Sequence, residues 1–343
     1  MVRWKDGGIP YVAKKITEEL RLAGIECEYI CCNEKGVLKN YLDFIRACLS
    51  KKSTIIHSHA LVTSLIACFC RAFNRRLKVL HHIHNDYPYL MQMNNSCLDL
   101  AKRFLFFYVF NRSEIVFTVI KSHVERLKSF SMGDKIRYLP NAVDINYCRV
   151  HSKERLKEYK SYCACRLDKE KNLYYLIDLV KLLNESGVYL TFHIYGRGVL
   201  YEGLRRRIES LGLSDLIYLK GYTNNPSVLP MEYDFYLSAS TREGASISCI
   251  TALKAGNALV STRVGDVDEE YIDKKYFIEI CGKDVEKDTV KLVGLIKDNN
   301  IGQISINGHI FAEKRYATEE FRSELIKVYR ELLEKNIARS LQL

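Results

Sequence analysis

Short apolar runs rich in β-branched and aromatic residues alternate along this chain with longer amphipathic runs. The short runs have the length of buried strands, and the longer runs repeat apolar residues every three or four positions, as helices do. Strands that alternate with helices are typical of α/β domains built on parallel sheets. In the first part of the chain the predicted strands are 27–32, 54–59, 78–84, 114–119 and 136–139.

A second series of strands begins after the charged stretch 151–160. A chain of 343 residues is too long for one ordinary domain and comfortable for two. We therefore predict one domain at 1–148, a second at 149–312 and a final helix at 313–343. The strands predicted for the second domain are 161–167, 190–195, 216–220, 235–238, 259–264 and 277–280.

Four predicted helices carry their apolar residues on one face, as helices that cover a core do. Another, near 98–110, is apolar almost all round, so we expect it to be buried or to dock on another surface. The four apolar faces are Val12, Ile16 and Leu20; Leu173, Leu176, Ile177, Val180 and Leu183; Leu200, Leu204, Ile208 and Leu211; and Phe321, Leu325, Val328 and Leu332.

The composition fits a soluble globular protein, with 48% hydrophobic and 27% charged residues. The longest uncharged apolar stretches, 60–70 and 104–110, fall short of the ~20 residues that cross a bilayer. Lysines interrupt the N-terminal segment, which lacks a signal-peptide pattern, so we predict a cytoplasmic protein. The twelve cysteines do not form metal-binding pairs, and we expect reduced thiols that pack as small hydrophobic groups.

The net charge of +11 is concentrated in the first part of the chain. Residues 1–150 hold 23 Lys and Arg against 13 Asp and Glu, whereas the remainder is almost neutral. An anionic partner would explain this excess: a membrane surface, a phosphate-bearing substrate or nucleic acid. A basic surface without a partner is equally consistent, and no nucleic-acid-binding motif accompanies the charge. Because Lys102, Arg103 and Arg112 flank the apolar run 104–110, we expect peripheral docking to anionic lipid on the inner face of the membrane.

Histidines gather where two predicted strands of the first domain end. His57 and His59 close one strand, and His81, His82 and His84 close the next, which is five of the nine histidines. A zinc site is one interpretation, but no cysteine or carboxylate lies at ligand spacing. We therefore expect hydrogen-bonding and turn roles and no metal, with His84 facing the ligand.

Three loops that precede helices carry residues suited to an anionic ligand. Gly7-Gly8 precedes the first helix, where backbone amides can approach an anion. Arg166 and Lys171 flank a turn from strand to helix, where they either converge on a diphosphate or are solvated loop cations. The segment 242–246 supplies a carboxylate, Glu243, and small residues before another helix.

Seven motifs, taken in this order, resemble those of the large family-4 retaining glycosyltransferases over nearly the whole chain. They are Gly7-Gly8, the two His-x-His pairs, Pro140-Asn141-Ala142-Val143-Asp144, Arg166-Leu167 with Lys171-Asn172, Tyr195-Gly196-x-Gly198, Glu243-Gly244 with Gly256, and Val260-Ser261-Thr262.

This resemblance implies a GT-B fold: two Rossmann-like domains with parallel sheets, a cleft between them and a final helix that crosses back to the first domain. It also implies a nucleotide-sugar donor, with a UDP-sugar favoured, and a glycan or lipid-linked acceptor in surface polysaccharide synthesis. No metal or other cofactor is implied. The residues expected to act in catalysis are Glu243, His84, Arg166 and Lys171, and those expected to bind the donor are Gly8, Arg166, Lys171, Glu243, Gly244, Ala245, Ser246 and Thr251.

The chain departs from the family pattern in four places. Thr251 stands where the family has the second glutamate of Glu-x7-Glu, Cys165 replaces a glycine, and Ala142 stands where the family has a glycine. The segment 1–5 is also too short for a full first strand. We expect either a reading frame that begins upstream of Met1 or a poorly formed first sheet.

These departures leave a second interpretation open, a catalytically weakened protein that binds a sugar nucleotide or a partner without turnover. A dinucleotide-dependent oxidoreductase has little support, because no GxGxxG follows a strand. Asp266-Val267-Asp268 matches a metal motif of a different glycosyltransferase fold, and we interpret it as chance.

Overall fold

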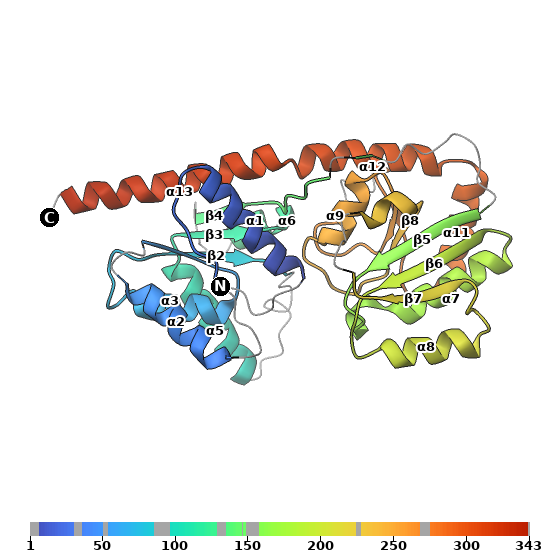
Figure 1. Cartoon of the computed structure of the whole chain (residues 1–343), viewed down its shortest axis with the longest axis horizontal. Coiled ribbons are helices and arrows are strands. Elements are labelled where there is room, and N and C mark those ends of the chain that lie inside the picture. Colours follow the sequence, from blue (N-terminus) through green and yellow to red (C-terminus); the bar gives the residue numbers. More distant parts are fainter. Residues whose placement is uncertain are drawn as a thin grey trace. The chain divides into compact units, whose positions relative to one another are not determined.

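The computed structural model describes residues 7–30, 36–50, 54–85, 97–128, 135–145, 147–148, 158–223, 228–267 and 275–341 (Figure 1). The chain divides into two compact units. The first contains Met1–Ala142 and Thr318–Leu343, and the second contains Val143–Ala317. Among the described residues, no helix is long and apolar enough to cross a membrane.

The sheet of the first unit has four parallel strands in the order β1-β2-β3-β4. The register aligns His57 with Leu80 and Ile83 with Thr118. All residues of β2 and β3 are buried, as expected for strands covered on both faces. The strands are β1 (Ile55–Ser58), β2 (Lys78–Ile83), β3 (Ile115–Thr118) and β4 (Ile136–Tyr138).

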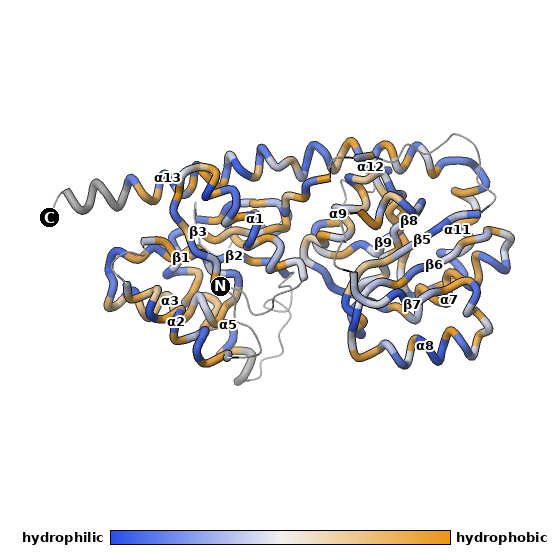
Figure 2. The backbone as a smooth tube through the Cα atoms, in the orientation of Figure 1, coloured by the Kyte–Doolittle hydropathy of each residue, from blue (hydrophilic) through white to orange (hydrophobic). Residues whose placement is uncertain are grey.

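Helices cover both faces of this sheet. On one face, Ser64 of α3 hydrogen-bonds to His81, and α5 also contacts β2. On the other face, Tyr329 of α13 hydrogen-bonds to His57, and α13 also contacts α1. The apolar stripes of these helices appear in Figure 2. The helices are α1 (Gly8–Leu22), α2 (Val37–Leu49), α3 (Leu61–Cys70), α5 (Cys97–Arg112), α6 (Lys121–Leu127) and α13 (Thr318–Leu341).

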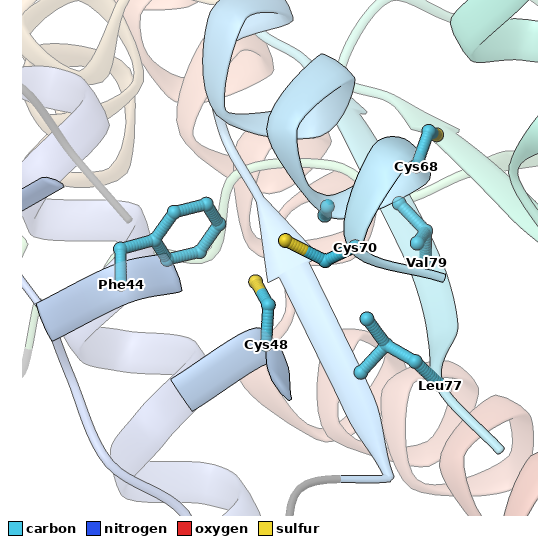
Figure 3. Close-up of a cluster of buried hydrophobic side chains, with 7 residues drawn as sticks. Phe44, Cys48, Cys68, Cys70, Leu77 and Val79 are labelled. Atoms are coloured by element: carbon cyan, nitrogen blue, oxygen red, sulfur yellow. The ribbon is translucent and has the colours of Figure 1, made fainter. Parts of the chain in front are cut away.

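Cysteines fill part of the core of the first unit (Figure 3). Cys48, Cys68 and Cys70 are buried beside Phe44 and Leu77. Burial raises the pKa of the Cys48 thiol to about 12 and that of Cys68 to about 11. These thiols therefore stay protonated and pack as small hydrophobic groups, as the sequence predicts.

The sheet of the second unit has six parallel strands in the order β10-β9-β8-β5-β6-β7. The first strand of this unit, β5, lies in the middle, and the strand order runs outward from it in both directions. This is the strand order of a doubly wound Rossmann-like sheet. The strands are β5 (Glu158–Ala164), β6 (Tyr189–Tyr195), β7 (Ile217–Gly221), β8 (Phe235–Ser238), β9 (Ala258–Ser261) and β10 (Ile278–Glu279).

Two groups of helices cover this second sheet. α7 contacts α8, α11 and β6, whereas α9 contacts α12, β8 and β9 (Figure 1). The helices are η3 (Lys169–Lys171), α7 (Leu173–Glu185), α8 (Tyr201–Ser210), η4 (Leu229–Glu232), α9 (Ile247–Lys254), α11 (Val285–Lys297) and α12 (Ile301–Arg315). The predicted fold class, two α/β units with parallel sheets, is confirmed.

One prediction about the first unit requires correction. The described part of 27–32 is not a strand, since it pairs with no strand of the described sheet, and the guanidinium of Arg21 on α1 donates to the Cys27 carbonyl. In α5, Phe106 and Phe110 are buried and Phe104 is exposed, so docking of this helix on another surface stays a prediction. The predictions for the strand at Met1–Lys5 and for Asp268 lie outside the described residues.

Candidate functional site

The strand order of the second sheet reverses between β5 and β8. Because β5 pairs with β6 on one edge and with β8 on the other, the loops that leave β5 and β8 diverge at their carboxyl ends. Open α/β sheets bind ligands at such a point. The loop after β5 contains Arg166 and Lys171, and the loop after β8 contains Glu243. The topology therefore brings these three predicted residues to one edge of the sheet.

Lys171 and Glu243 form an ion pair at this edge. Their side chains are only 13% and 19% exposed. Ser240 donates a hydrogen bond of 3.0 Å to the same carboxylate oxygen of Glu243. Burial lowers the pKa of the Lys171 ammonium, but the neighbouring Glu243 raises it more, and the net pKa lies above the usual value. Lys171 is therefore a fixed positive charge at neutral pH.

Arg166 presents its guanidinium to solvent. The side chain is 73% exposed, and it pairs with Asp168 at 2.8 Å within the same loop. The next turn is tied to the loop after β8, because the amide of Thr241 donates to the Glu170 carbonyl at 2.8 Å. Arg166 thus lies on a braced loop with a charged group that a ligand can reach.

The segment Gly244–Ser246 leads into the N-terminus of α9. Ser246 caps this helix by accepting a hydrogen bond from the amide of Cys249. Behind the segment, the amide of Asp266 donates to the Gly244 carbonyl at 2.9 Å. Gly265 has φ +65°, and a Cβ there would lie 1.9 Å from that carbonyl oxygen. Only glycine permits the close contact that fixes the backbone of Gly244.

Thr251 lies one turn further along α9, and it is 6% exposed. Its hydroxyl donates a hydrogen bond of 2.8 Å to the Ile247 carbonyl inside the same helix. The hydroxyl oxygen keeps acceptor capacity, but the proton is already committed.

The glycines of the 195–198 motif support the loop after β5. Gly196 has φ +144°, and a Cβ there would lie 1.8 Å from the Cys165 carbonyl oxygen. A Cβ on Gly198 would lie 2.3 Å from the Leu167 carbonyl oxygen. Both glycines therefore allow backbone-to-backbone packing next to Arg166.

Asp266 has a packing role in the second unit. Its side chain is 4% exposed, pairs with Arg315 at 2.9 Å and accepts a hydrogen bond of 2.6 Å from Tyr316. This buried network satisfies both carboxylate oxygens, so Asp266 does not face solvent as a metal ligand would.

Gly8 and His84 belong to the first unit. Gly8 opens α1 and is exposed, directly after Gly7 with φ +112°. His84 is buried, and its Nε2 lies 2.7 Å from Nδ1 of His59. Burial, with a smaller contribution from His81, lowers the pKa of His84 to about 3. His84 is therefore a neutral hydrogen-bonding group at physiological pH.

Sequence reasoning missed Ser240, which holds Glu243, and the pairing of Lys171 with Glu243 itself. The strand order is the feature that would have revealed this pair. The residues after β5 and β8 are more than 60 positions apart, and they come close only because β5 pairs in parallel with β8. The resulting edge combines the Lys171–Glu243 pair, an exposed arginine and a helix N-terminus, which suits a ligand with both anionic and hydroxyl groups.

Two family models match the chain: Glycosyl transferases group 1 over residues 148–299 and Glycosyltransferase Family 4 over residues 35–147. They follow one another without overlap, and the motifs around Arg166 and Glu243 fall inside the first. The chain belongs to the family-4 GT-B glycosyltransferases. The resemblance inferred from the motifs is thereby confirmed.

Two relatives show how this glycosyltransferase chain compares with curated proteins. It is 28% identical over 191 residues to the UDP-N-acetylglucosamine–peptide N-acetylglucosaminyltransferase GtfA subunit of Streptococcus gordonii, which covers 53% of this chain and 37% of that protein. It is 27% identical over 258 residues to an N-acetylgalactosamine-N,N'-diacetylbacillosaminyl-diphospho-undecaprenol 4-alpha-N-acetylgalactosaminyltransferase of Campylobacter jejuni, which covers 74% and 62%. The chain thus spans less than two thirds of either relative.

Among solved structures, HepE of Anabaena in complex with UDP has the same fold. Its TM-score with this chain is 0.74 at 15% identity, over 96% of this chain and 98% of HepE. At that identity the likeness concerns the fold alone.

Proposed function

We propose that this protein is a retaining glycosyltransferase that moves a sugar from a UDP-sugar to a glycan or lipid-linked acceptor in surface polysaccharide synthesis. The observation that carries the proposal is the Lys171–Glu243 pair beside the N-terminus of α9, at the edge where the second sheet reverses its strand order. Such an edge is the ligand-binding position of a doubly wound sheet.

The names of the relatives support the donor and the acceptor. The S. gordonii relative is named for UDP-N-acetylglucosamine, and HepE was solved with UDP. The C. jejuni relative is named for a diphospho-undecaprenol acceptor. A UDP-sugar and a lipid-linked glycan are therefore the first substrates to test.

The main chemical demand of the reaction is the negative charge that develops on the leaving diphosphate. Lys171, Arg166 and the amides at the start of α9 would stabilise this charge, and no metal ion is required for that role. Glu243 would accept hydrogen bonds from sugar hydroxyls, as a carboxylate acceptor can do for two donors. The ion pair holds the Glu243 carboxylate in place before the sugar arrives.

The experiment is a radiolabel assay that measures donor hydrolysis and transfer across common UDP- and GDP-sugars, with and without a chelator. We expect UDP release for at least one UDP-sugar, retention of anomeric configuration in the product, and no loss with chelator. Release of UDP that persists undiminished when Lys171 is replaced by Met would contradict the assignment of the site.

A second candidate is a protein that binds a sugar nucleotide with little turnover. The observation that favours it is Thr251, whose buried hydroxyl already donates to Ile247. Such a side chain can satisfy only part of a ribose diol. Donor binding by calorimetry without measurable UDP release would favour this candidate over the enzyme.

We also propose that the first unit docks on an anionic membrane surface. A cavity of about 1020 Å³ is lined by six cations, a set that includes Arg75 and Lys135. Exposed aromatic side chains lie nearby: Phe69 of α3 is 64% exposed, Phe73 in the turn after α3 is 86% exposed, and Phe104 of α5 is 70% exposed. Apolar side chains beside cations suit an interface that combines acyl chains with anionic headgroups. The cations of the cavity are Arg71, Arg75, Lys78, Arg112, Lys135 and Arg137.

A further inference from the structure

Three histidines of the first sheet gather on one of its faces. His57 and His59 are two residues apart around the end of β1, so their side chains point to the same side. His82 projects to that side from the neighbouring strand β2. One ring nitrogen from each of the three lies within 4.8 Å of the other two. In the described part of the chain, this is the group of metal-ligating side chains that comes together in this way.

Hydrogen bonds from Nδ1 orient the rings of His57 and His59. Nδ1 of His57 lies 3.0 Å from the hydroxyl of Tyr329 on α13. Nδ1 of His59 lies 2.7 Å from Nε2 of His84. When each Nδ1 carries the proton and donates it, each Nε2 is a hydrogen-bond acceptor, and that of His57 accepts from Nδ1 of His82 until a metal ion takes its place. Ligating histidines in metal sites use the same division of roles, with one nitrogen on the metal and the other on an orienting partner.

The distance between the ring nitrogens of His57 and His82 matches that between two ligands of one metal ion. Nε2 of His57 lies 3.3 Å from Nδ1 of His82. Two nitrogens bound at ~2.0–2.1 Å in a tetrahedral site are about 3.4 Å apart. The third ligand, from His59, requires an adjustment of side chains and no change of the sheet.

His82 is itself incompletely satisfied. It is 1% exposed, and its Nε2 has no hydrogen-bond partner among the described residues. A buried polar atom of this kind costs free energy unless a partner is supplied. A small rotation of the ring offers either nitrogen of His82 to a shared ligand.

We propose that His57, His59 and His82 bind one transition-metal ion of the zinc class, with Tyr329 and His84 as orienting partners. Three imidazoles without a thiolate suit Zn²⁺, Co²⁺, Ni²⁺ or Cu²⁺, and the fourth position is left to solvent. The site lies in the first sheet, so it cross-links β1 to β2 and does not depend on the proposed transfer reaction. It replaces the expectation of no metal, which considered ligand spacing along the chain and not across two paired strands.

The experiment uses the full chain without a histidine tag, stripped with chelator and titrated with Co²⁺. We expect one Co²⁺ per chain, with the visible absorption of a four-coordinate ion, and displacement by one equivalent of Zn²⁺. His59→Gln should weaken binding at least a hundredfold, because it removes a ligand. Tyr329→Phe should weaken binding by about ten- to a hundredfold, because it removes only an orienting partner.

The matched control is His81→Gln. His81 precedes His82 on β2 but faces the other side of the sheet, where it hydrogen-bonds to Ser64 at 2.7 Å. This variant should keep stoichiometric Co²⁺ binding even if it lowers the melting temperature. The wild-type titration decides the matter even if a variant fails to fold: absence of stoichiometric Co²⁺ and Zn²⁺ binding overturns the proposal, as does equal binding by folded His59→Gln. Neither result bears on UDP-sugar turnover.

Discussion

Lys171 and Glu243, 72 positions apart, share one ion pair whose two side chains are each less than one-fifth exposed. In the proposed reaction the lysine faces a diphosphate and the carboxylate faces sugar hydroxyls. Each residue therefore positions the other before the donor binds. When the donor binds, part of the ion pair must give way to contacts with the diphosphate and the sugar.

We predict that Lys171→Met lowers kcat/KM by about a hundredfold or more, since one positioned charge at a developing anion contributes ~2.7–4 kcal/mol. Glu243→Ala should lower transfer by roughly ten- to a hundredfold or more, because charged acceptors contribute ~1.5–3 kcal/mol. Steady-state kinetics of UDP release measures both. Lys169→Met is the control: Lys169 is exposed on the same turn, and its loss should change the rate less than twofold. Full activity in Glu243→Ala would end the catalytic assignment.

A second prediction concerns Thr251 and the ribose of the donor. If its hydroxyl oxygen accepts a ribose hydrogen bond, Thr251→Val removes the acceptor at nearly constant volume and should weaken UDP binding by up to about tenfold. Thr251→Glu should strengthen it, because a carboxylate can accept both hydroxyls. Calorimetry with UDP measures the two dissociation constants, and circular dichroism checks the fold. Unchanged affinity in both folded variants would refute the ribose role.

The third prediction separates a clash from backbone strain. Gly265 and Gly212 have nearly the same positive φ, +65° and +67°, but a Cβ on Gly212 would meet nothing within 4 Å. Gly212→Ala should therefore cost only ~1–2 kcal/mol for the left-handed backbone. Gly265→Ala should cost more and also displace the Gly244 carbonyl, weakening UDP binding. Urea unfolding and calorimetry measure the two effects. Equal losses in both variants would show that the contact with Gly244 is unimportant.

Glu19 gives a prediction about pH. It is 1% exposed on α1 and pairs with Lys15 on the same helix and with Arg322 on α13. Burial raises the pKa of this carboxyl, but the hydrogen bonds from Arg322 and Lys15 lower it more, to a net value below 4.5. A carboxyl group whose pKa is lower in the folded state than in the unfolded state stabilises the fold fully at pH values above its unfolded-state pKa. That stabilisation is lost as the pH falls through the folded-state pKa.

Glu19→Gln should accordingly lower the free energy of unfolding by about 2 kcal/mol at pH 7, a value reduced from that of a fully buried pair because Arg322 is 41% exposed. The difference in the free energy of unfolding between the variant and the wild type should stay constant down to about pH 4.5 and then become smaller. Urea unfolding at a series of pH values measures it. A gap that widens in acid would contradict the assigned direction of the pKa.

The fifth prediction tests membrane docking. The protein should co-sediment with vesicles that contain phosphatidylglycerol at low salt and should be released near 1 M NaCl, where the Debye length is ~3 Å. The double variant Phe69→Ser, Phe73→Ser should bind at least tenfold more weakly without loss of stability, because both side chains are mostly exposed. Val199→Ser, at a 90% exposed position in the second unit, is the control. Binding that is indifferent to salt would refute electrostatic docking.

The strands that the sequence predicted correctly include several that are buried on both faces, and also β6, whose residues alternate between buried and at least partly exposed. The runs at 78–84 and 235–238 became β2 and β8, all of whose residues are buried, so their apolar pattern left little ambiguity. The run at 27–32 is also rich in apolar residues, but its described part pairs with no strand of the described sheet. A strand needs a partner as well as a suitable run of residues, and a local pattern does not reveal whether that partner is present.

The sequence predicts which residues form the candidate site, but it does not predict how they are arranged in space. Arg166, Lys171 and Glu243 follow strands and precede helices, which a linear pattern reveals. Their pairing depends on β5 lying beside β8, a choice of strand order that no local pattern encodes. The histidines show the same limit, because His57 and His82 become neighbours only through the pairing of β1 with β2.

The first unit is assembled from both ends of this chain. Tyr329 and Arg322 of α13 bond to His57 and Glu19, which are made more than 250 residues earlier. During synthesis the second unit is therefore complete at Ala317, before the first has received the helix that covers one face of its sheet. The second unit can therefore fold before the first is complete, which is the reverse of the usual order in which the N-terminal domain folds first. The exposed face of that sheet must wait for α13, and this interval is when a nascent chain most needs protection from aggregation.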